Sequence, residues 1–126
     1  MNSYLAEHLN AARKLVPMIA PADAARLLGQ SDVLFLDVRD VTEIEAAGKI
    51  KGALNISRGV LEFKADPKSP VHEVKLAREK TIIVYSAADD RSALAGATLK
   101  QMGFPNVRNM GAFDVWKRGG GAVEFC

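Results

Sequence analysis

The residues with the clearest chemical potential lie between Thr81 and Met102, where a short apolar run is followed by a polar loop and a helix pattern. The run TIIVY is rich in β-branched residues and predicts a buried parallel strand over 81–85. The sequence SAADDR comes next, and SALAGATLKQM then predicts a helix that ends at Gly103. A loop that enters a helix N-terminus directs backbone N–H groups and the positive end of the helix dipole at one point, which favours anion binding.

Ser86 stands at the tip of the predicted strand, where such a loop would present a nucleophile. A serine hydroxyl needs a general base before it can attack a substrate. The chain has no GxSxG motif, and His8 and His72 fall in the first predicted helix and in a long loop. We therefore interpret Ser86 as a hydroxyl that hydrogen-bonds the loop amides, and a serine hydrolase as the less favoured alternative.

Two carboxylates, Asp89 and Asp90, lie in the same loop, close to the place where an anion would bind. Aspartate near a helix start is favoured as a cap and by the helix dipole. The same carboxylates would repel an anion and compete for its amides. We expect one of them to hold Arg91.

Strands alternate with helices along the rest of the chain, which predicts an α/β fold with a mostly parallel sheet. Ligands of such sheets bind at the carboxyl ends of the strands, where Asp37, Arg39, Arg58 and the 86–91 loop fall. We expect Asp37 and Arg39 to brace this region by a charge-assisted hydrogen bond, or alternatively to shape a binding pocket. The predicted elements are helices over 3–16, 21–29, 41–47, 92–102 and 111–117, strands over 33–38, 81–85 and 106–109, a short strand within 49–56, and a helical turn over 59–63.

Composition limits the classes of function that the chain can have. Its 126 residues suit one domain, and a net charge of +2 with scattered basic residues favours neither nucleic acid nor a membrane as partner. No apolar stretch is long enough to span a bilayer and no signal pattern is present, so we expect a cytoplasmic protein. The one cysteine, Cys126, is interpreted as a bystander thiol, and neither a metal nor a cofactor is expected.

Five motifs occur in a fixed order: DVRD at 37–40, GKIKGALNI at 48–56, SRGVLEF at 57–63, YSAADDRSALAG at 85–96 and LKQMGFPNVRNMGAFDVWKRGGGAVE at 99–124. In this order and spacing they resemble a rhodanese-like domain, over roughly residues 18 to 124. The resemblance implies a central, mostly parallel five-stranded sheet flanked by helices on both faces. It places the domain at 18–126, with 1–17 as a helix packing on or beside it.

In active members of that family, a cysteine at the position of Ser86 accepts a sulfane sulfur and passes it on from a persulfide. Persulfide chemistry requires a thiolate, so the resemblance implies that the sulfur carrier is absent. The four residues between 86 and 91 match sulfurtransferases, because the related phosphatases have five. The family's loop glycine is replaced by aspartates here, its usual histidine by Lys49, and a later glycine by Ala112.

We interpret the chain as a rhodanese-like protein without sulfurtransferase activity that acts as a binding or regulatory module. A small sulfur-containing anion or a protein is the expected partner, and the chain is expected to be a monomer or a homodimer. By the resemblance, Ser86 and Arg91 hold the catalytic positions, Asp37 braces the loop, and the anion-binding residues are Ala87, Ala88, Asp89, Asp90, Arg91, Ser92, Arg39 and Arg58.

Two alternatives remain. One is a thiosulfate or persulfide sulfurtransferase seen as a Cys→Ser variant at position 86, although the further changes at Asp89 and Asp90 favour natural divergence over an engineered substitution. The other is a self-associating or partner-binding scaffold that uses the N-terminal helix.

Overall fold

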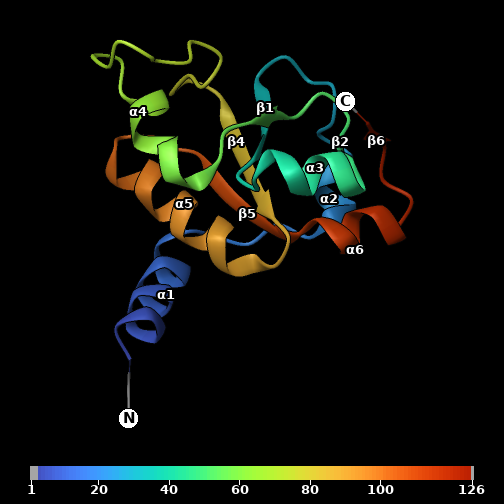
Figure 1. Ribbon diagram of the computed structural model, residues 1–126, viewed down its shortest axis with the longest axis horizontal. Helices are drawn as coiled ribbons and strands as arrows, with labels where there is room; N and C mark the ends of the chain where they lie inside the picture. Colours follow the sequence, from blue (N-terminus) through green and yellow to red (C-terminus); the bar gives the residue numbers. More distant parts are fainter. Residues whose placement is uncertain (1–2, 126) are drawn as a thin grey trace.

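A computed structural model describes residues 3–125 of the chain. Helices and strands alternate along it, as the sequence predicts (Figure 1). The elements are α1 (Tyr4–Leu15), α2 (Pro21–Ala25), β1 (Val33–Asp37), α3 (Val41–Ala47), β2 (Lys49–Ile50), β3 (Leu54–Asn55), the 3-10 helix η1 (Arg58–Val60), α4 (Leu61–Ala65), β4 (Thr81–Ser86), α5 (Asp89–Gln101), β5 (Val107–Ala112), α6 (Phe113–Arg118) and β6 (Val123–Glu124).

The central sheet has four parallel strands in the order β3-β1-β4-β5. The predicted five-strand count is therefore wrong for this sheet. Beyond β5, where a fifth strand would lie, the structure has only an isolated parallel bridge between Met18 and Asn109. Pro17 has no backbone N–H to donate and Pro21 already opens α2, so pairing with β5 is limited to the Ile19 N–H bonded to the carbonyl of Asn109 and the Asn109 N–H bonded to the carbonyl of Pro17.

A second, antiparallel pair of strands joins β2 to β6, with Lys49 opposite Glu124 and Ile50 opposite Val123. This pair ties the last described residues of the chain to the segment that follows α3. Each strand has only two residues, so neither carries the alternation of apolar and polar residues by which a strand is predicted.

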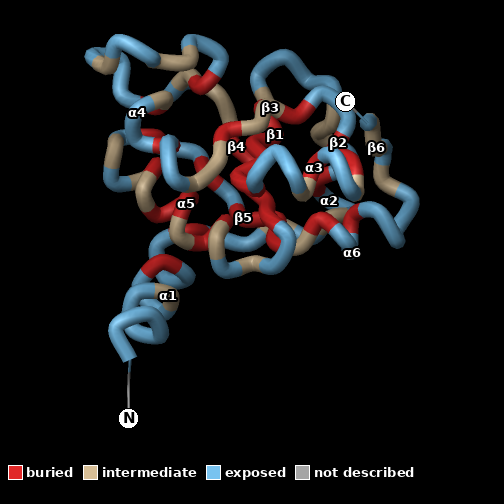
Figure 2. Tube along the Cα trace, in the orientation of Figure 1, coloured by how far each residue is buried: buried red, intermediate tan, exposed pale blue. Residues whose placement is uncertain are grey.

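Each face of the central sheet is covered by helices (Figures 1 and 2). Alternate residues of the strands point to opposite faces, so Leu34 and Leu36 join one core cluster with α1, α4 and α5. Phe35 joins the other cluster with residues of α2 and α6. Phe113 and Trp116 belong to this second cluster and are buried.

Helix α1 projects from the body of the molecule (Figure 1). The side chain of Ser3 accepts a hydrogen bond from the Ala6 N–H at 3.0 Å and so caps the start of α1. Ala12 and Val16 pack into the first core cluster, whereas the earlier turns of the helix are largely exposed (Figure 2). None of the helices within 3–125 is long and apolar enough to cross a membrane.

Candidate functional site

The β4–α5 junction places Ser86 at the end of its strand, as predicted, but the connecting loop is shorter than expected. Helix α5 begins at Asp89, so only Ala87 and Ala88 lie between strand and helix. Asp89 and Asp90 are the acidic residues of the first helical turn, where the helix dipole stabilises their charge. The aspartates thus start the helix early, and the second half of the expected six-residue loop, Asp89 to Arg91, is helical.

The Ser86 side chain is completely buried, and its hydrogen bonds are all internal. Its hydroxyl donates to the carbonyl of Ala88 and accepts from the N–H of Ser92 at 3.1 Å. The sequence predicted a bond to the loop amides, and the amide that Ser86 accepts from instead belongs to Ser92 of α5. Ser92 is buried as well, and its own hydroxyl donates to the carbonyl of Asp89 at 3.2 Å.

The two aspartates have different partners. Asp90 accepts a hydrogen bond from the N–H of Arg91 at 2.9 Å, so a carboxylate occupies an amide that an anion could have used. Asp89 instead forms an ion pair with Arg13 of α1, with Nη2 and Oδ1 3.2 Å apart. The expectation that an aspartate holds the Arg91 side chain is wrong, because that side chain extends across to α3.

Arg91 makes a two-pronged contact with Glu43, with Nη1–Oε1 at 2.7 Å and Nη2–Oε2 at 2.8 Å. These hydrogen bonds lower the pKa of Glu43 to about 2. Glu43 also accepts from the N–H of Asp40 at 3.2 Å, which completes a capping box at the start of α3. We did not predict Glu43 as a site residue, although the Asp40-x-x-Glu43 spacing is a recognisable helix-start signal.

Asp37 and Arg39 form a buried ion pair next to the loop. The guanidinium Nε lies 3.0 Å from Oδ1 and Nη2 lies 2.7 Å from Oδ2, which confirms the predicted charge-assisted hydrogen bond. Nη2 also donates to the carbonyl of Gly48 at 2.7 Å, so the pair holds the end of α3. Burial, with the nearby charge of Asp37, raises the pKa of the Tyr85 hydroxyl, which accepts from the N–H of Ile50 at 3.0 Å.

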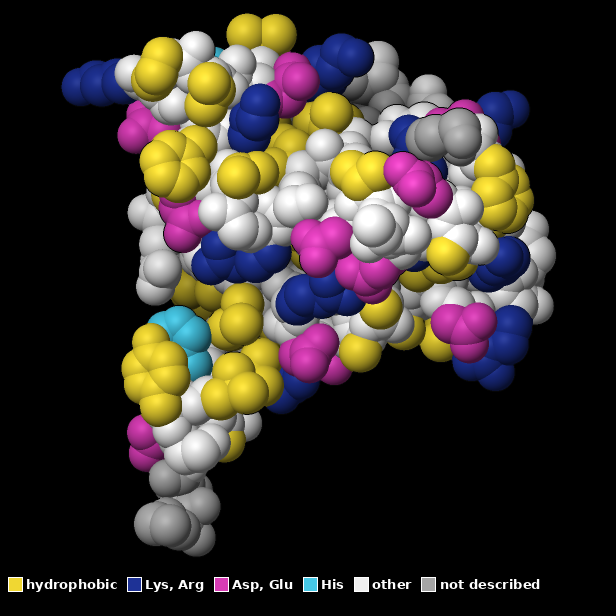
Figure 3. Space-filling view, viewed as in Figure 1, with side chains coloured by type: hydrophobic (Ala, Val, Ile, Leu, Met, Phe, Trp, Pro, Cys, Tyr) yellow, Lys and Arg dark blue, Asp and Glu magenta, His cyan; other side chains and the backbone are white. Residues whose placement is uncertain are grey.

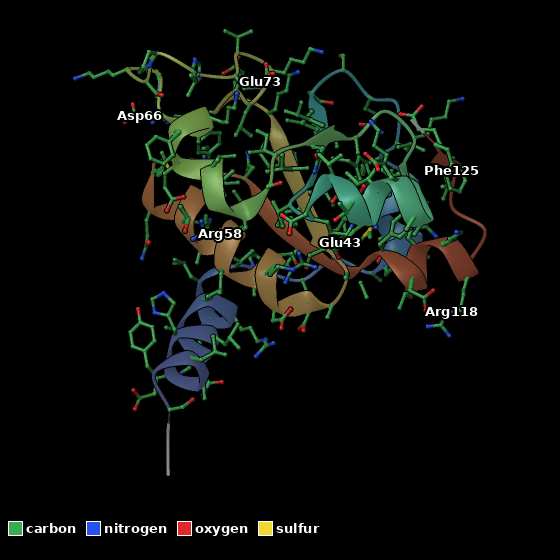
Figure 4. The ribbon with its side chains drawn as sticks, in the orientation of Figure 1. Glu43, Arg58, Asp66, Glu73, Arg118 and Phe125 are labelled. Carbon is green, nitrogen blue, oxygen red and sulfur yellow. The ribbon has the colours of Figure 1, made fainter. Side chains whose placement is uncertain are left out.

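Arg58 is not brought to the loop. Its guanidinium donates to the hydroxyl of Thr98 at 3.0 Å and pairs with Glu62 at 2.9 Å. Thr98 lies six residues beyond Ser92 on α5, which corresponds to about 9 Å along the helix axis. Figure 4 shows Arg58 over α5, apart from the labelled Glu43.

A cavity of about 360 Å³ adjoins the loop between α3 and α6, near the carboxyl ends of the strands. Among the predicted site residues, Arg39 and Ala87 line it, whereas Ser86 and Arg91 do not. Cys126 lies outside the described residues. The lining residues are Arg39, Glu43, Ala46, Ala47, Ala87, Phe113, Asp114 and Lys117.

Comparison with known proteins agrees with the fold. Residues 20–118 match the family model of the rhodanese-like domain. A sulfurtransferase of Allochromatium vinosum is 30% identical over 96 residues, which cover 75% of this chain and 81% of that protein.

Two solved structures extend the comparison. A protein of unknown function from Rhodopseudomonas palustris, described as a possible tyrosine phosphatase, is 37% identical with a TM-score of 0.90, over 98% of this chain and 96% of that one. The 30 kDa polysulfide-sulfur transferase homodimer from Wolinella succinogenes is 34% identical with a TM-score of 0.75, over 95% of this chain and 86% of that one. Because the family model matches residues 20–118, which are most of the chain, the chain belongs to the family of rhodanese-like domains.

Proposed function

We propose that this chain is a rhodanese-like domain without sulfurtransferase activity that acts as a binding or regulatory module. The proposal rests on the position, burial and hydrogen bonds of the Ser86 hydroxyl. Its hydroxyl occupies the position from which a thiolate would carry sulfur, and it is buried and bonded to Ala88 and Ser92. A hydroxyl cannot form the persulfide that sulfur transfer requires.

The groups around Ser86 support the same proposal. An anion at the start of α5 would need free N–H groups and a positive side chain. The N–H of Arg91 is taken by Asp90, and the N–H of Ser92 is taken by Ser86. The guanidinium of Arg91 is neutralised by Glu43. The junction therefore offers a sulfur anion few of the contacts that would bind it.

The cavity beside the loop suits a binding role better than the junction does. Ala46, Ala47 and Phe113 give it an apolar wall. The Arg39 charge is neutralised by Asp37, which leaves the ammonium of Lys117, held by the carbonyl of Ala47 at 3.2 Å, as a cation at the rim. An apolar side chain next to a carboxylate, presented by a protein partner, matches this lining.

Cyanolysis of the purified chain, with thiosulfate and then polysulfide as donor, tests the loss of activity. We expect no turnover, and clear turnover by the unmodified chain would contradict the proposal. The partner site is tested separately by selecting displayed peptides on the full chain. We expect enrichment of an apolar residue beside Asp or Glu, with binding reduced by Lys117→Glu and unaffected by Lys75→Glu in the exposed 66–80 loop.

The second candidate is a sulfurtransferase seen with serine at position 86. It is favoured by the sulfurtransferase of Allochromatium vinosum and the polysulfide-sulfur transferase of Wolinella succinogenes. The codon for residue 86 in the natural gene decides directly between natural divergence to serine and an engineered Cys→Ser substitution. Activity gained by Ser86→Cys alone would favour this candidate, with Ser69→Cys as the control for a thiol elsewhere. Activity that appears only when Asp90→Gly is added would mean that the aspartate had closed the site.

A further inference from the structure

Helix α1 exposes a largely apolar stripe along its length that the rest of the described chain leaves uncovered. Tyr4, His8, Ala11 and Leu15 follow the spacing i, i+4, i+7, i+11, which places them on one side of the helix. Tyr4 is 78% exposed and Leu15 is 41% exposed. A helix of twelve residues is marginal in water by itself, so an unpacked stripe of this kind is costly unless another surface covers it.

A groove of about 290 Å³ lies between α1 and α5, and His8, Ala11 and Leu15 of the stripe form part of its α1 wall. Small and apolar side chains line it, among them Ala11 on α1 and Leu94 and Ala97 on α5. Small residues allow the backbone of another helix to approach closely. Figure 3 shows hydrophobic side chains on the projecting arm at the lower left and in the hollow between this arm and the body. The stripe thus forms one wall of a groove that a second apolar helix face could fill.

The charges on α1 specify what can fill the groove. Glu7 and Lys14 are seven residues apart and therefore lie on the same flank of the stripe. A second α1 running antiparallel would place its Lys14 opposite Glu7, and its Glu7 opposite Lys14. A parallel helix would turn the opposite flank of its stripe toward Glu7 and Lys14, so neither pair would form, and its dipole would be unfavourably aligned. Arg13 already forms an ion pair with Asp89. In the last turn of α1, Lys14 is therefore the basic residue that remains to pair with Glu7 of a second copy.

We propose that the chain forms a symmetric dimer in which α1 of each copy lies antiparallel in the groove between α1 and α5 of the other. The interface is isologous, because each copy contributes one stripe and one groove. Two Glu7–Lys14 pairs flank the buried stripes of Tyr4 and Leu15. This inference goes beyond the proposed function and does not depend on it, since it involves a different surface from the cavity beside Ser86.

Sedimentation velocity on the full chain, over a concentration series up to about 100 μM, tests the dimer. We expect a species of twice the 13.6 kDa chain mass. Tyr4→Glu should abolish it by placing a carboxylate in the buried stripe. Val74→Glu, which alters an equally exposed apolar residue in the 66–80 loop, should leave the dissociation constant unchanged. A chain that stays monomeric throughout the series, or a dimer that is indifferent to Tyr4→Glu, would overturn the proposal.

Charge reversal tests the antiparallel register independently of the apolar contacts. Glu7→Lys and Lys14→Glu should each raise the dissociation constant about tenfold or more, because each creates two repulsive pairs. The double variant restores both pairs with inverted sign and should return to within about threefold of the unmodified chain. Both positions are exposed, and circular dichroism checks that the variants remain folded. Failure of the double variant to recover, with its fold intact, would contradict the antiparallel arrangement.

Discussion

Arg91 and Glu43 join the first turn of α5 to the first turn of α3, through two hydrogen bonds of 2.7 and 2.8 Å. An arginine in the first turn of a helix faces the positive end of the helix dipole, which disfavours it. Glu43 offsets that cost with its own charge while it caps α3. The pair therefore fixes the two helix starts that flank the Ser86 junction.

Glu43→Gln should lower the free energy of unfolding by about 1 kcal/mol at pH 7, a figure kept small because both side chains are about one-third exposed. The pKa of Glu43 is about 2 in the folded chain, below its ordinary value of 4.5. Its contribution is therefore complete above pH 4.5 and is lost as the pH falls through about 2. Urea unfolding at pH 7, 4 and 2.5 measures the difference.

The matched control is Glu45→Gln, on the exposed side of the same helix. It should change the free energy of unfolding by less than about 0.5 kcal/mol at every pH. If the cost of Glu43→Gln did not shrink between pH 4 and pH 2.5, the ion pair would not be its source.

Ser86→Ala should lower the free energy of unfolding by about 1–3 kcal/mol, because it leaves the buried N–H of Ser92 without an acceptor. Urea unfolding of the purified variant provides the measurement. Ser69→Ala is the comparison, since the Ser69 hydroxyl accepts from Val71 in an exposed loop where water can replace it. Equal costs for the two variants would argue against a structural role for the Ser86 hydroxyl.

Arg39→Met should be among the most destabilising single substitutions, at about 3–5 kcal/mol, because it leaves the Asp37 carboxylate buried and unpaired. Adding Asp37→Asn removes that charge while keeping an oxygen for the Arg39 backbone N–H, which bonds Asp37 at 3.0 Å. The double variant should therefore be more stable than Arg39→Met alone. A double-mutant cycle of unfolding free energies tests this, and simple additivity would refute the coupling.

Gly121→Ala should be more costly than Gly120→Ala. A Cβ at Gly121 would lie 2.3 Å from Cε2 of Trp116, whereas a Cβ at Gly120 would meet nothing within 4 Å. Gly120 has a φ of +85°, so alanine there costs about 1 kcal/mol in backbone strain. Trp116 is buried and cannot move aside freely, so Gly121→Ala should cost roughly 1–3 kcal/mol.

Thermal unfolding ranks the two glycine variants, and fluorescence locates the effect. Trp116 is the sole tryptophan of the chain, so the tryptophan emission reports the environment of this one indole. We expect a red shift in Gly121→Ala and an unchanged spectrum in Gly120→Ala. The opposite pattern would mean that the tail is not packed against the indole.

Helices and strands were predicted well where the residues that indicate an element lie within it or directly next to it in the sequence. Helix α3 runs over Val41–Ala47 as expected, because Asp40 caps its start and Gly48, with a φ of +80°, ends it. The strand after the 66–80 loop was predicted from β-branched residues alone, and the structure extends it by one residue to Ser86.

Relations between distant residues could not be predicted in the same way. Arg91 finds Glu43, 48 positions earlier, only because α3 and α5 start at the same edge of the sheet. Arg58 is drawn to Thr98, 40 positions later, although it follows a strand end as the site residues do. A strand end restricts where a backbone lies, but a long arginine side chain can reach partners in several directions from it.

Val16, the C-cap residue of α1, packs against Gly96 of α5. A Cβ at Gly96 would lie 3.1 Å from both methyl groups of Val16, so the helix is held at its C-terminal end by a socket that a larger residue would fill. Twelve residues reach about 18 Å from that fulcrum. A tilt of about 5° at Val16 would swing Tyr4 by roughly 1.5 Å, and Arg13, near the fulcrum, would pull on Asp89. A movement of the exposed end of α1 would thus be transmitted, through the Arg13–Asp89 ion pair, to the first residue of α5, three positions after Ser86.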